Sequence, residues 1–175
     1  MEKMIFVVRK AVEEDIPDIL RITKEAFKMY AESAGITGNM PALEETSDEV
    51  KRDIETKECY VALIDGVVVG SVRVEVRADN TAYLSRFGVE TSFQSRGVGT
   101  VLMNAVDEGM INLNVNSLYL HTASKILSLV RFYYGRGFYI DSTTKDRGYI
   151  RALLCKEYDS ERTTCVSRMY QNCAV

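Results

Sequence analysis

The fold of this chain is decided by the stretch YLSRFGVETSFQSRGVGT, residues 83–100. Residues 83–89 are predicted to form a strand, in which the internal Gly88 indicates a bulge or a close backbone approach. Apolar residues then recur at helical spacing from Val98 to Met110. A strand, a glycine-rich turn and a helix in succession direct unpaired backbone N–H groups and the positive end of the helix dipole towards one point. The stretch therefore predicts an anion-binding site.

Two glycines in this turn, Gly97 and Gly99, are predicted to let the backbone approach a phosphate without an intervening Cβ atom, and Arg96 adds a charged donor. The same glycines could instead serve only a tight turn from strand to helix. Two nucleotide motifs are absent from the sequence: there is no G-x-x-x-x-G-K-[ST], and Leu102 replaces the third glycine of G-x-G-x-x-G. ATP and NAD are therefore disfavoured as ligands.

Elements on both sides of this stretch follow from hydrophobic periodicity and turn residues. Upstream, the sequence predicts a strand over 4–9, a helix from about 13 to 30, a charged helix over 44–57, and a hairpin of strands 59–64 and 67–77 around the turn pair Asp65-Gly66. Downstream, it predicts a strand over 118–122, a helix over 126–134 that ends at Gly135 and Gly137, and strands over 138–141 and 148–158. This order predicts an α/β (α+β) fold in which helices cover a sheet.

Length and composition predict one globular domain over residues 1–158, followed by a polar tail over 159–175. The tail is interpreted as mobile, and an arm that supports a homodimer remains open. A formal net charge of −3 disfavours nucleic acid and membrane surfaces as partners. Neither a signal peptide nor a membrane-spanning run is recognised, so a cytoplasmic location is expected.

Metal chemistry is not expected from this sequence. The four cysteines lie far apart, and the chain contains a single histidine, His121. We interpret the thiols as free or buried, because a cytoplasmic domain of this size usually keeps its cysteines reduced.

Two motifs resemble those of the GCN5-related N-acetyltransferase (GNAT) superfamily. Gln94-x-x-Gly97-x-Gly99, placed after a strand, is similar to the pyrophosphate loop Q/R-x-x-G-x-G/A of that family. FYYGRGF at 132–138 resembles its F-Y-x-x-x-G-F signature, and the separation of the two motifs is typical of the family. The likeness extends over about residues 5–158. It implies a mixed, mostly antiparallel sheet of about seven strands flanked by about four helices.

The resemblance also implies acetyl-CoA as co-substrate. Its pyrophosphate would contact the backbone amides of Gln94, Ser95, Arg96, Gly97, Val98, Gly99 and Thr100. Main-chain groups of Phe87 and Val89 would meet the pantetheine arm, and an amide near Val89 would polarise the thioester carbonyl. Ile126 stands where related proteins often carry an asparagine that contacts the cofactor, so that contact is expected to be absent or supplied differently.

Tyr133 matches the family tyrosine that meets the departing thiolate, with Tyr134 as the weaker candidate. Proton transfer from a phenol of pKa about 10 to a thiolate of pKa about 8.5 is uphill by roughly 2 kcal/mol, which favours a hydrogen bond with late proton transfer. A core aromatic residue is the alternative interpretation of Tyr133.

The general base is less clearly indicated. Many family members place a glutamate early in the strand before the loop, where this chain has Tyr83. His121, at the end of a central strand, has a suitable unperturbed pKa, although a lone histidine is more often a structural residue. Glu75 is a second option, but Arg73 and Arg77 on the same strand face suggest a solvated ion cluster. A water chain to solvent is the third.

Together these features predict transfer of an acetyl group from acetyl-CoA to a primary amine of a small molecule or peptide, by direct attack in a ternary complex. The departure at Tyr83 keeps a non-catalytic acyl-CoA-binding or regulatory module as the alternative. A protein-interaction domain without a small ligand is a third interpretation. An aminoglycoside, a polyamine, an amino acid and a protein N-terminus all remain open as acceptors.

Overall fold

The computed structural model describes residues 5–158. The predicted tail at 159–175, with two of the four cysteines, lies outside the described residues. Cys59 and Cys155, the two within the described range, are buried free thiols. No helix among residues 5–158 is long and apolar enough to cross a membrane.

Seven strands and four α-helices follow one another along the chain in the order that the sequence predicts. They are β1 (Phe6–Lys10), α1 (Ile16–Ala34), α2 (Ser47–Thr56), β2 (Glu58–Ile64), β3 (Val67–Val76), β4 (Thr81–Val89), α3 (Val98–Asn112), β5 (Ser117–Ala123), α4 (Leu127–Tyr134), β6 (Tyr139–Thr144) and β7 (Arg151–Glu157). Short 3-10 turns lie at Glu13–Asp15 (η1), Pro41–Leu43 (η2) and Thr91–Phe93 (η3).

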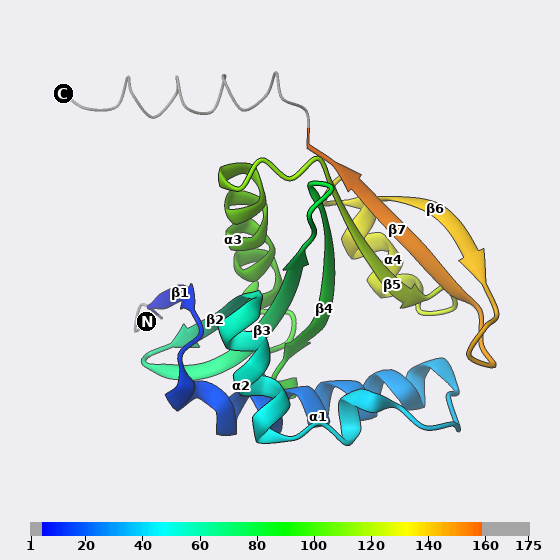
Figure 1. Ribbon diagram of the computed structural model, residues 1–175. Helices are drawn as coiled ribbons and strands as arrows, with labels where there is room; N and C mark the ends of the chain where they lie inside the picture. The colour runs from blue at the N-terminus through cyan, green and yellow to red at the C-terminus, as the bar shows by residue number, and fades with distance from the viewer. Residues whose placement is uncertain (1–4, 159–175) are drawn as a thin grey trace.

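The strands form one sheet in the order β1-β2-β3-β4-β5-β7-β6. All neighbours are antiparallel except β4 and β5, which run parallel. Their pairing is limited to three residue pairs, Thr81–Tyr83 against Ser117–Tyr119. Beyond these pairs the two strands spread apart towards their C-terminal ends (Figure 1). The sheet therefore opens in its middle.

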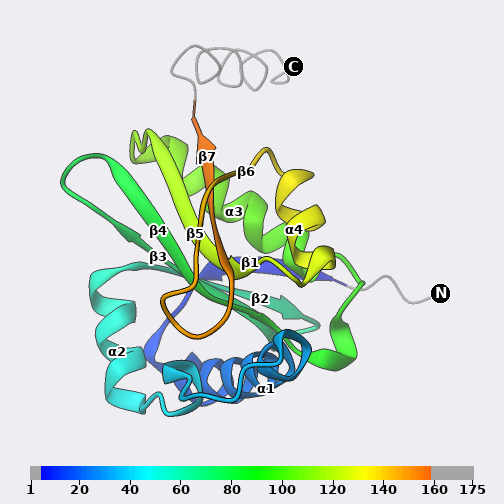
Figure 2. The same cartoon turned by 90° about the vertical axis from the view of Figure 1, so that its right-hand side faces the viewer.

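Helices cover both faces of the sheet (Figure 1, Figure 2). On one face α3 buries its apolar stripe, including Leu102 and Met103, in the larger core cluster. On the other face, α1 and α2 supply Ile19, Ile22 and Val50 to a second cluster against β2 and β3. Each helix thus has the amphipathic pattern expected of a helix that packs on a sheet.

The prediction of a solvated ion cluster on β3 is wrong for Arg73. Glu75 and Arg77 are exposed, but the Arg73 side chain is only 2% exposed and is bound by Glu45 and Asp53. The α2 region covers this part of the strand, because Glu45 precedes α2 and Asp53 lies within it. A buried arginine requires charged partners, and both come from a segment that adjoins β3 only after folding.

Strand β4 contains the predicted irregularity, two residues before Gly88. The register shifts so that Arg86 and Phe87 lie opposite the single residue Val72, and Arg86 has a φ of +51°. This is a β-bulge. Gly88 meets the second expectation, a close approach, because a Cβ atom there would lie 3.2 Å from the Cβ of Ala26 on α1.

Candidate active site

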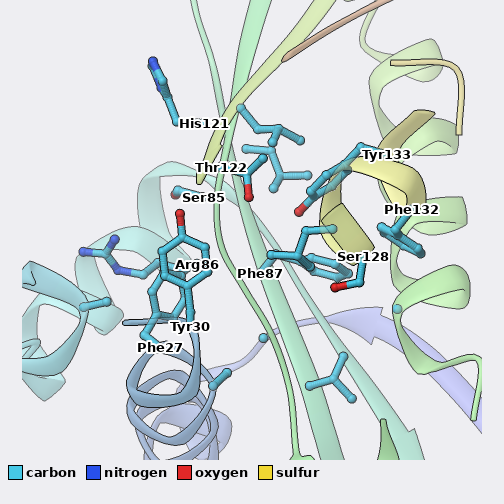
Figure 3. A pocket seen from close by; sticks show the side chains of 18 of the residues that line it. Phe27, Tyr30, Ser85, Arg86, Phe87, His121, Thr122, Ser128, Phe132 and Tyr133 are labelled. Atoms are coloured by element: carbon cyan, nitrogen blue, oxygen red, sulfur yellow. The ribbon is translucent and has the colours of Figure 1, made fainter. Parts of the chain in front are cut away.

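A cavity of about 1010 Å³ occupies the opening between β4 and β5. Residues from α1, the η2 turn, β4, the loop before α3, β5, α4 and the β6–β7 loop line it. Figure 3 shows its two sides, with Phe27, Tyr30 and Arg86 opposite Ser128, Phe132 and Tyr133. The predicted cofactor loop, except Arg96, and both predicted catalytic residues contribute to this one cavity.

The N-terminus of α3 offers unpaired donors to the cavity. Gly97 is the N-cap, and no side chain caps the helix. The first backbone bond of this helix runs from Val101 N to Gly97 O at 3.1 Å. The N–H groups of Val98, Gly99 and Thr100 therefore precede the hydrogen-bonded part of the helix, where a helix dipole favours negative charge. These residues, together with Gln94, Ser95 and Gly97, line the cavity.

The two glycines of the loop, Gly97 and Gly99, are required for different structural reasons. Gly97 has a φ of +85°, a conformation that disfavours other residues, and the space where its Cβ would lie is open. At Gly99 a Cβ atom would lie 3.2 Å from the Phe87 ring and 3.6 Å from the Phe132 ring. The positive φ thus explains Gly97, whereas Gly99 is explained by packing between β4 and α4.

Arg96 lies outside the cavity. Its guanidinium sits 5.4 Å from the centre of the Phe93 ring, and the residue is exposed. In this conformation the expected charged donor does not contribute to the cavity.

Main-chain groups of Phe87 and Val89 face the opening between the strands. Glu90 N donates to Val69 O at 2.8 Å, so the backbone groups of Glu90 point towards β3. Successive residues of a strand direct their N–H and C=O groups to opposite sides. Val89, and Phe87 two residues before it, therefore direct theirs away from β3 and towards the cavity that they line.

Tyr133 lies in an aromatic shell on the α4 side. It is 5% exposed, and the ring centres of Phe132, Phe138 and Phe87 are 5.3, 5.5 and 6.4 Å away. Its hydroxyl points into the cavity (Figure 3). Burial raises the pKa of Tyr133 far above its usual range, so the hydroxyl stays protonated and can donate. Tyr134 is instead 49% exposed and accepts a hydrogen bond from Ile140 N at 3.3 Å, outside the cavity.

His121 and Tyr83 form a pair on the opposite face of the sheet from Tyr133. The Tyr83 hydroxyl lies 2.8 Å from His121 Nδ1. Burial, followed by the charge of Arg151, lowers the pKa of His121, and burial raises the pKa of Tyr83. The imidazole is therefore neutral near pH 7 and can accept a proton at Nε2 when Nδ1 donates to Tyr83. Glu75 is exposed on β3 and does not line the cavity.

Tyr30 is a cavity residue that sequence reasoning did not single out. Its hydroxyl accepts a hydrogen bond from Ala123 N at 2.7 Å and points into the cavity (Figure 3). Burial raises its pKa to about 12. The helical spacing placed Tyr30 on the buried face of α1, and nothing in the sequence indicated its contact with β5, 93 residues further on.

Comparison with known proteins gives one family and many solved relatives. The family model described as "Acetyltransferase (GNAT) family" matches residues 18–138. The N-acetyltransferase PaiA of Thermoplasma acidophilum, solved with coenzyme A, superposes with a TM-score of 0.77 at 19% identity, over 89% of this chain and 100% of that one. The protein yncA of Salmonella typhimurium, solved with acetyl-CoA, gives a TM-score of 0.72 at 15% identity, over 91% of this chain and 96% of that one. Ard1 of Thermoplasma volcanium gives 0.69 at 21% identity, over 89% and 99%.

Proposed function

The chain belongs to the acetyltransferase (GNAT) family, and on that premise we propose that it transfers an acetyl group from acetyl-CoA to a primary amine of a small molecule or peptide. The observation that carries this proposal is the meeting of two groups in one cavity. One is the uncapped N-terminus of α3, and the other is the buried hydroxyl of Tyr133. The first suits a pyrophosphate and the second suits a leaving thiolate.

Acetyl-CoA fits the residues present. The backbone N–H groups at 98–100 and the open space beside Gly97 would hold the pyrophosphate. The groups that Phe87 and Val89 direct into the opening would hold the pantetheine amides, and the Val89 N–H would polarise the thioester carbonyl. When bound, acetyl-CoA supplies the acetyl group and the thiol leaving group.

Tyr133 would donate a hydrogen bond to the thiolate sulfur as the thioester bond breaks. Its raised pKa makes complete proton transfer less favourable than for an ordinary phenol, so the hydroxyl acts mainly as a donor that stabilises charge. On the other side of the opening, His121 Nε2 would take the proton of the attacking amine, directly or through water, while Tyr83 holds the ring by its Nδ1.

Calorimetry and turnover test the proposal together. The folded protein is titrated with acetyl-CoA and CoA, with ATP and NAD as controls, and CoA release is then followed on a panel of amines. We expect binding of acetyl-CoA and CoA alone, and turnover on at least one amine. A folded protein that fails to bind acetyl-CoA contradicts the assignment of residues 94–100.

A non-catalytic acyl-CoA-binding module is the second candidate, favoured by one observation. Among the cavity-lining residues within 5–158 there is no Asp or Glu, so no carboxylate base faces the ligand. This candidate predicts acetyl-CoA binding without CoA release on any amine, and with no change in affinity between wild type and His121→Asn.

A further inference from the structure

The charged residues that line the cavity are all arginines. Arg86, Arg147 and Arg151 contribute to it, whereas no acidic residue among the described lining residues does. This contrasts with the whole chain, whose formal net charge is −3. Arg86 lies opposite the α4 residues Ser128, Phe132 and Tyr133 (Figure 3), and Arg147 and Arg151 come from the β6–β7 loop and the first residue of β7. We call the part of the cavity lined by α1, Arg86 and these two arginines the acceptor side.

Arg86 is held in place rather than free in solvent. Its Nε donates to Glu45 Oε1 at 3.1 Å, and its guanidinium lies 5.9 Å from the centre of the Phe27 ring. The bulge in β4, with the Arg86 backbone at a φ of +51°, turns this residue out of the regular strand. No protein partner is found among residues 5–158 for its two terminal nitrogens, Nη1 and Nη2. Within the described residues, two donors of this cavity-lining side chain are thus left without a protein partner.

The ion network behind Arg86 carries an excess of positive charge. Glu45 accepts two hydrogen bonds from Arg73, at 2.7 and 2.8 Å, before it contacts Arg86. Asp53 is shared between Arg73 at 2.9 Å and Lys57 at 2.8 Å. Two carboxylates therefore pair with three cations: Glu45 and Asp53 with Arg73, Lys57 and Arg86. Glu45 and Arg73 are almost fully buried.

The nearest further carboxylate does not remove this excess. Glu49 is fully exposed on α2, and its carboxylate accepts hydrogen bonds from Thr46 N and Thr46 Oγ1 at 2.7 and 2.9 Å. Water screens its interaction with Arg86. An anion that enters the cavity would meet Arg86, whose one carboxylate partner within residues 5–158, Glu45, already accepts two hydrogen bonds from Arg73.

Two further arginines, Arg147 and Arg151, line the same cavity. Arg151 is neutralised by Asp146, which accepts from its Nε and Nη2 at 3.2 and 2.7 Å. Arg147, in the same β6–β7 loop, lines the cavity and makes no ion pair within the described residues. The acceptor side therefore presents Arg86 and Arg147 as cations without a dedicated carboxylate.

We propose that the acetyl acceptor is an amine that also carries an oxyanion, a carboxylate or a phosphate, and that Arg86 binds this group. The inference rests on the proposed function and narrows it. A guanidinium presents parallel N–H groups that match a carboxylate or phosphate, and such charge-assisted bonds are strong where water is partly excluded. A polycationic acceptor such as a polyamine or an aminoglycoside would instead place like charges beside Arg86 and Arg147.

The test compares acceptors that differ only in the anionic group. For several amino acids, turnover is measured beside the decarboxylated amine, the carboxamide and the aminophosphonate of the same skeleton, with spermidine as the polycation. We expect kcat/KM to be higher for the carboxylate or the phosphonate than for the neutral counterparts by about tenfold or more, the range of a charged hydrogen bond. The two acidic series identify which oxyanion is preferred. A wild-type preference for the neutral amine or for spermidine overturns the proposal.

The variants Arg86→Gln and Arg86→Lys test whether the preference for acidic acceptors depends on the Arg86 side chain. We expect Arg86→Gln to lower kcat/KM roughly tenfold to a hundredfold for the acidic acceptor and less than about threefold for its neutral counterpart, with partial recovery in Arg86→Lys. Arg52→Gln on the exposed side of α2 is the matched control and should change neither. Equal losses for both acceptors in Arg86→Gln contradict the proposal, and melting curves of all variants monitor folding.

Binding separates a failure of this inference from a failure of the proposed function. Calorimetry with the acidic compound in the presence of CoA measures its affinity without chemistry. Binding that weakens in Arg86→Gln, without turnover on any amine, would leave the anion site standing while transfer fails. Turnover confined to neutral amines would retain transfer and remove the anion site. Absence of acidic-ligand binding by the folded wild-type protein also overturns the inference.

Discussion

The two sides of the cavity offer different kinds of groups to a ligand. The side next to α3 and β4 offers backbone groups: the N–H groups at 98–100 and the main chain of Phe87 and Val89. The acceptor side offers side chains from distant segments, among them Tyr30 on α1, Arg86 in the bulge and Arg147 in the β6–β7 loop. Backbone donors depend on local geometry, whereas side-chain donors depend on the packing of distant elements. Four changes test whether the two sides behave independently.

The largest effect is expected on the stability of the fold, at the buried ion pair between Arg73 and Glu45, which also contacts Arg86. Arg73→Ala leaves Glu45 buried without its main partner, and loss of one partner from a buried ion pair costs about 3–5 kcal/mol. Chemical denaturation should register this loss in the free energy of unfolding. Arg21→Ala, which removes exposed pairs with Asp18 and Glu90, is the control and should cost less than about 1 kcal/mol. Comparable losses for the two variants would show that the Arg73 network is not a structural support.

The next largest effect is expected at the α4 side. Tyr133→Phe removes the donor for the thiolate and keeps the ring within its aromatic shell, so kcat should fall by about a hundredfold or more. The acetyl-CoA Kd from calorimetry should change little, since the ring is retained. Tyr134→Phe, outside the cavity, is the control. An unchanged kcat in Tyr133→Phe would assign the residue to the core alone.

A smaller effect is expected for the backbone site. Gly97→Ala forces a residue with a Cβ atom to a φ of +85°, at a cost of about 1–2 kcal/mol, and should weaken acetyl-CoA binding about tenfold as the loop relaxes. Gly66 provides a control, because it has a φ of +84° in the β2–β3 turn and equally open space. Gly66→Ala should lower the melting temperature and leave the acetyl-CoA Kd unchanged. Equal affinities in both variants would remove the anion site from this loop.

The smallest effect is a displacement of the pH profile. Burial and Arg151 lower the pKa of His121, so kcat/KM should stay constant as pH falls through 6.5 and decline only below that value. His121→Asn should abolish this acid limb. The unfolded chain binds the proton at a higher pH than the folded one, so protonation favours unfolding, and part of the stability present above pH 6.5 is lost as pH falls below it. An acid limb that persists in His121→Asn would assign it to another group.

The same division explains what the sequence could predict. Element order, the Asp65-Gly66 turn, the irregularity near Gly88 and the loop at Gly97 each follow from residues that are neighbours in the chain, and the structure contains all four. Burial of Arg73 could not be predicted, because strand alternation shows which residues share a face and not what covers that face. Tyr30 and Arg86 escaped prediction for the same reason, since their partners at Ala123 and Glu45 are distant in sequence.

The separation of β4 from β5 gives the sheet an edge in its interior. Unpaired N–H and C=O groups on an edge strand normally template association with other chains, which proteins avoid by shielding the edge. Here residues of α1 and α4 line the same cavity as Phe87 and Val89, so both helices flank this interior edge, and under the proposed function an extended small molecule, the pantetheine arm, would pair with it. The amide hydrogens of Phe87 and Val89 would therefore exchange with solvent more slowly once such a molecule is bound.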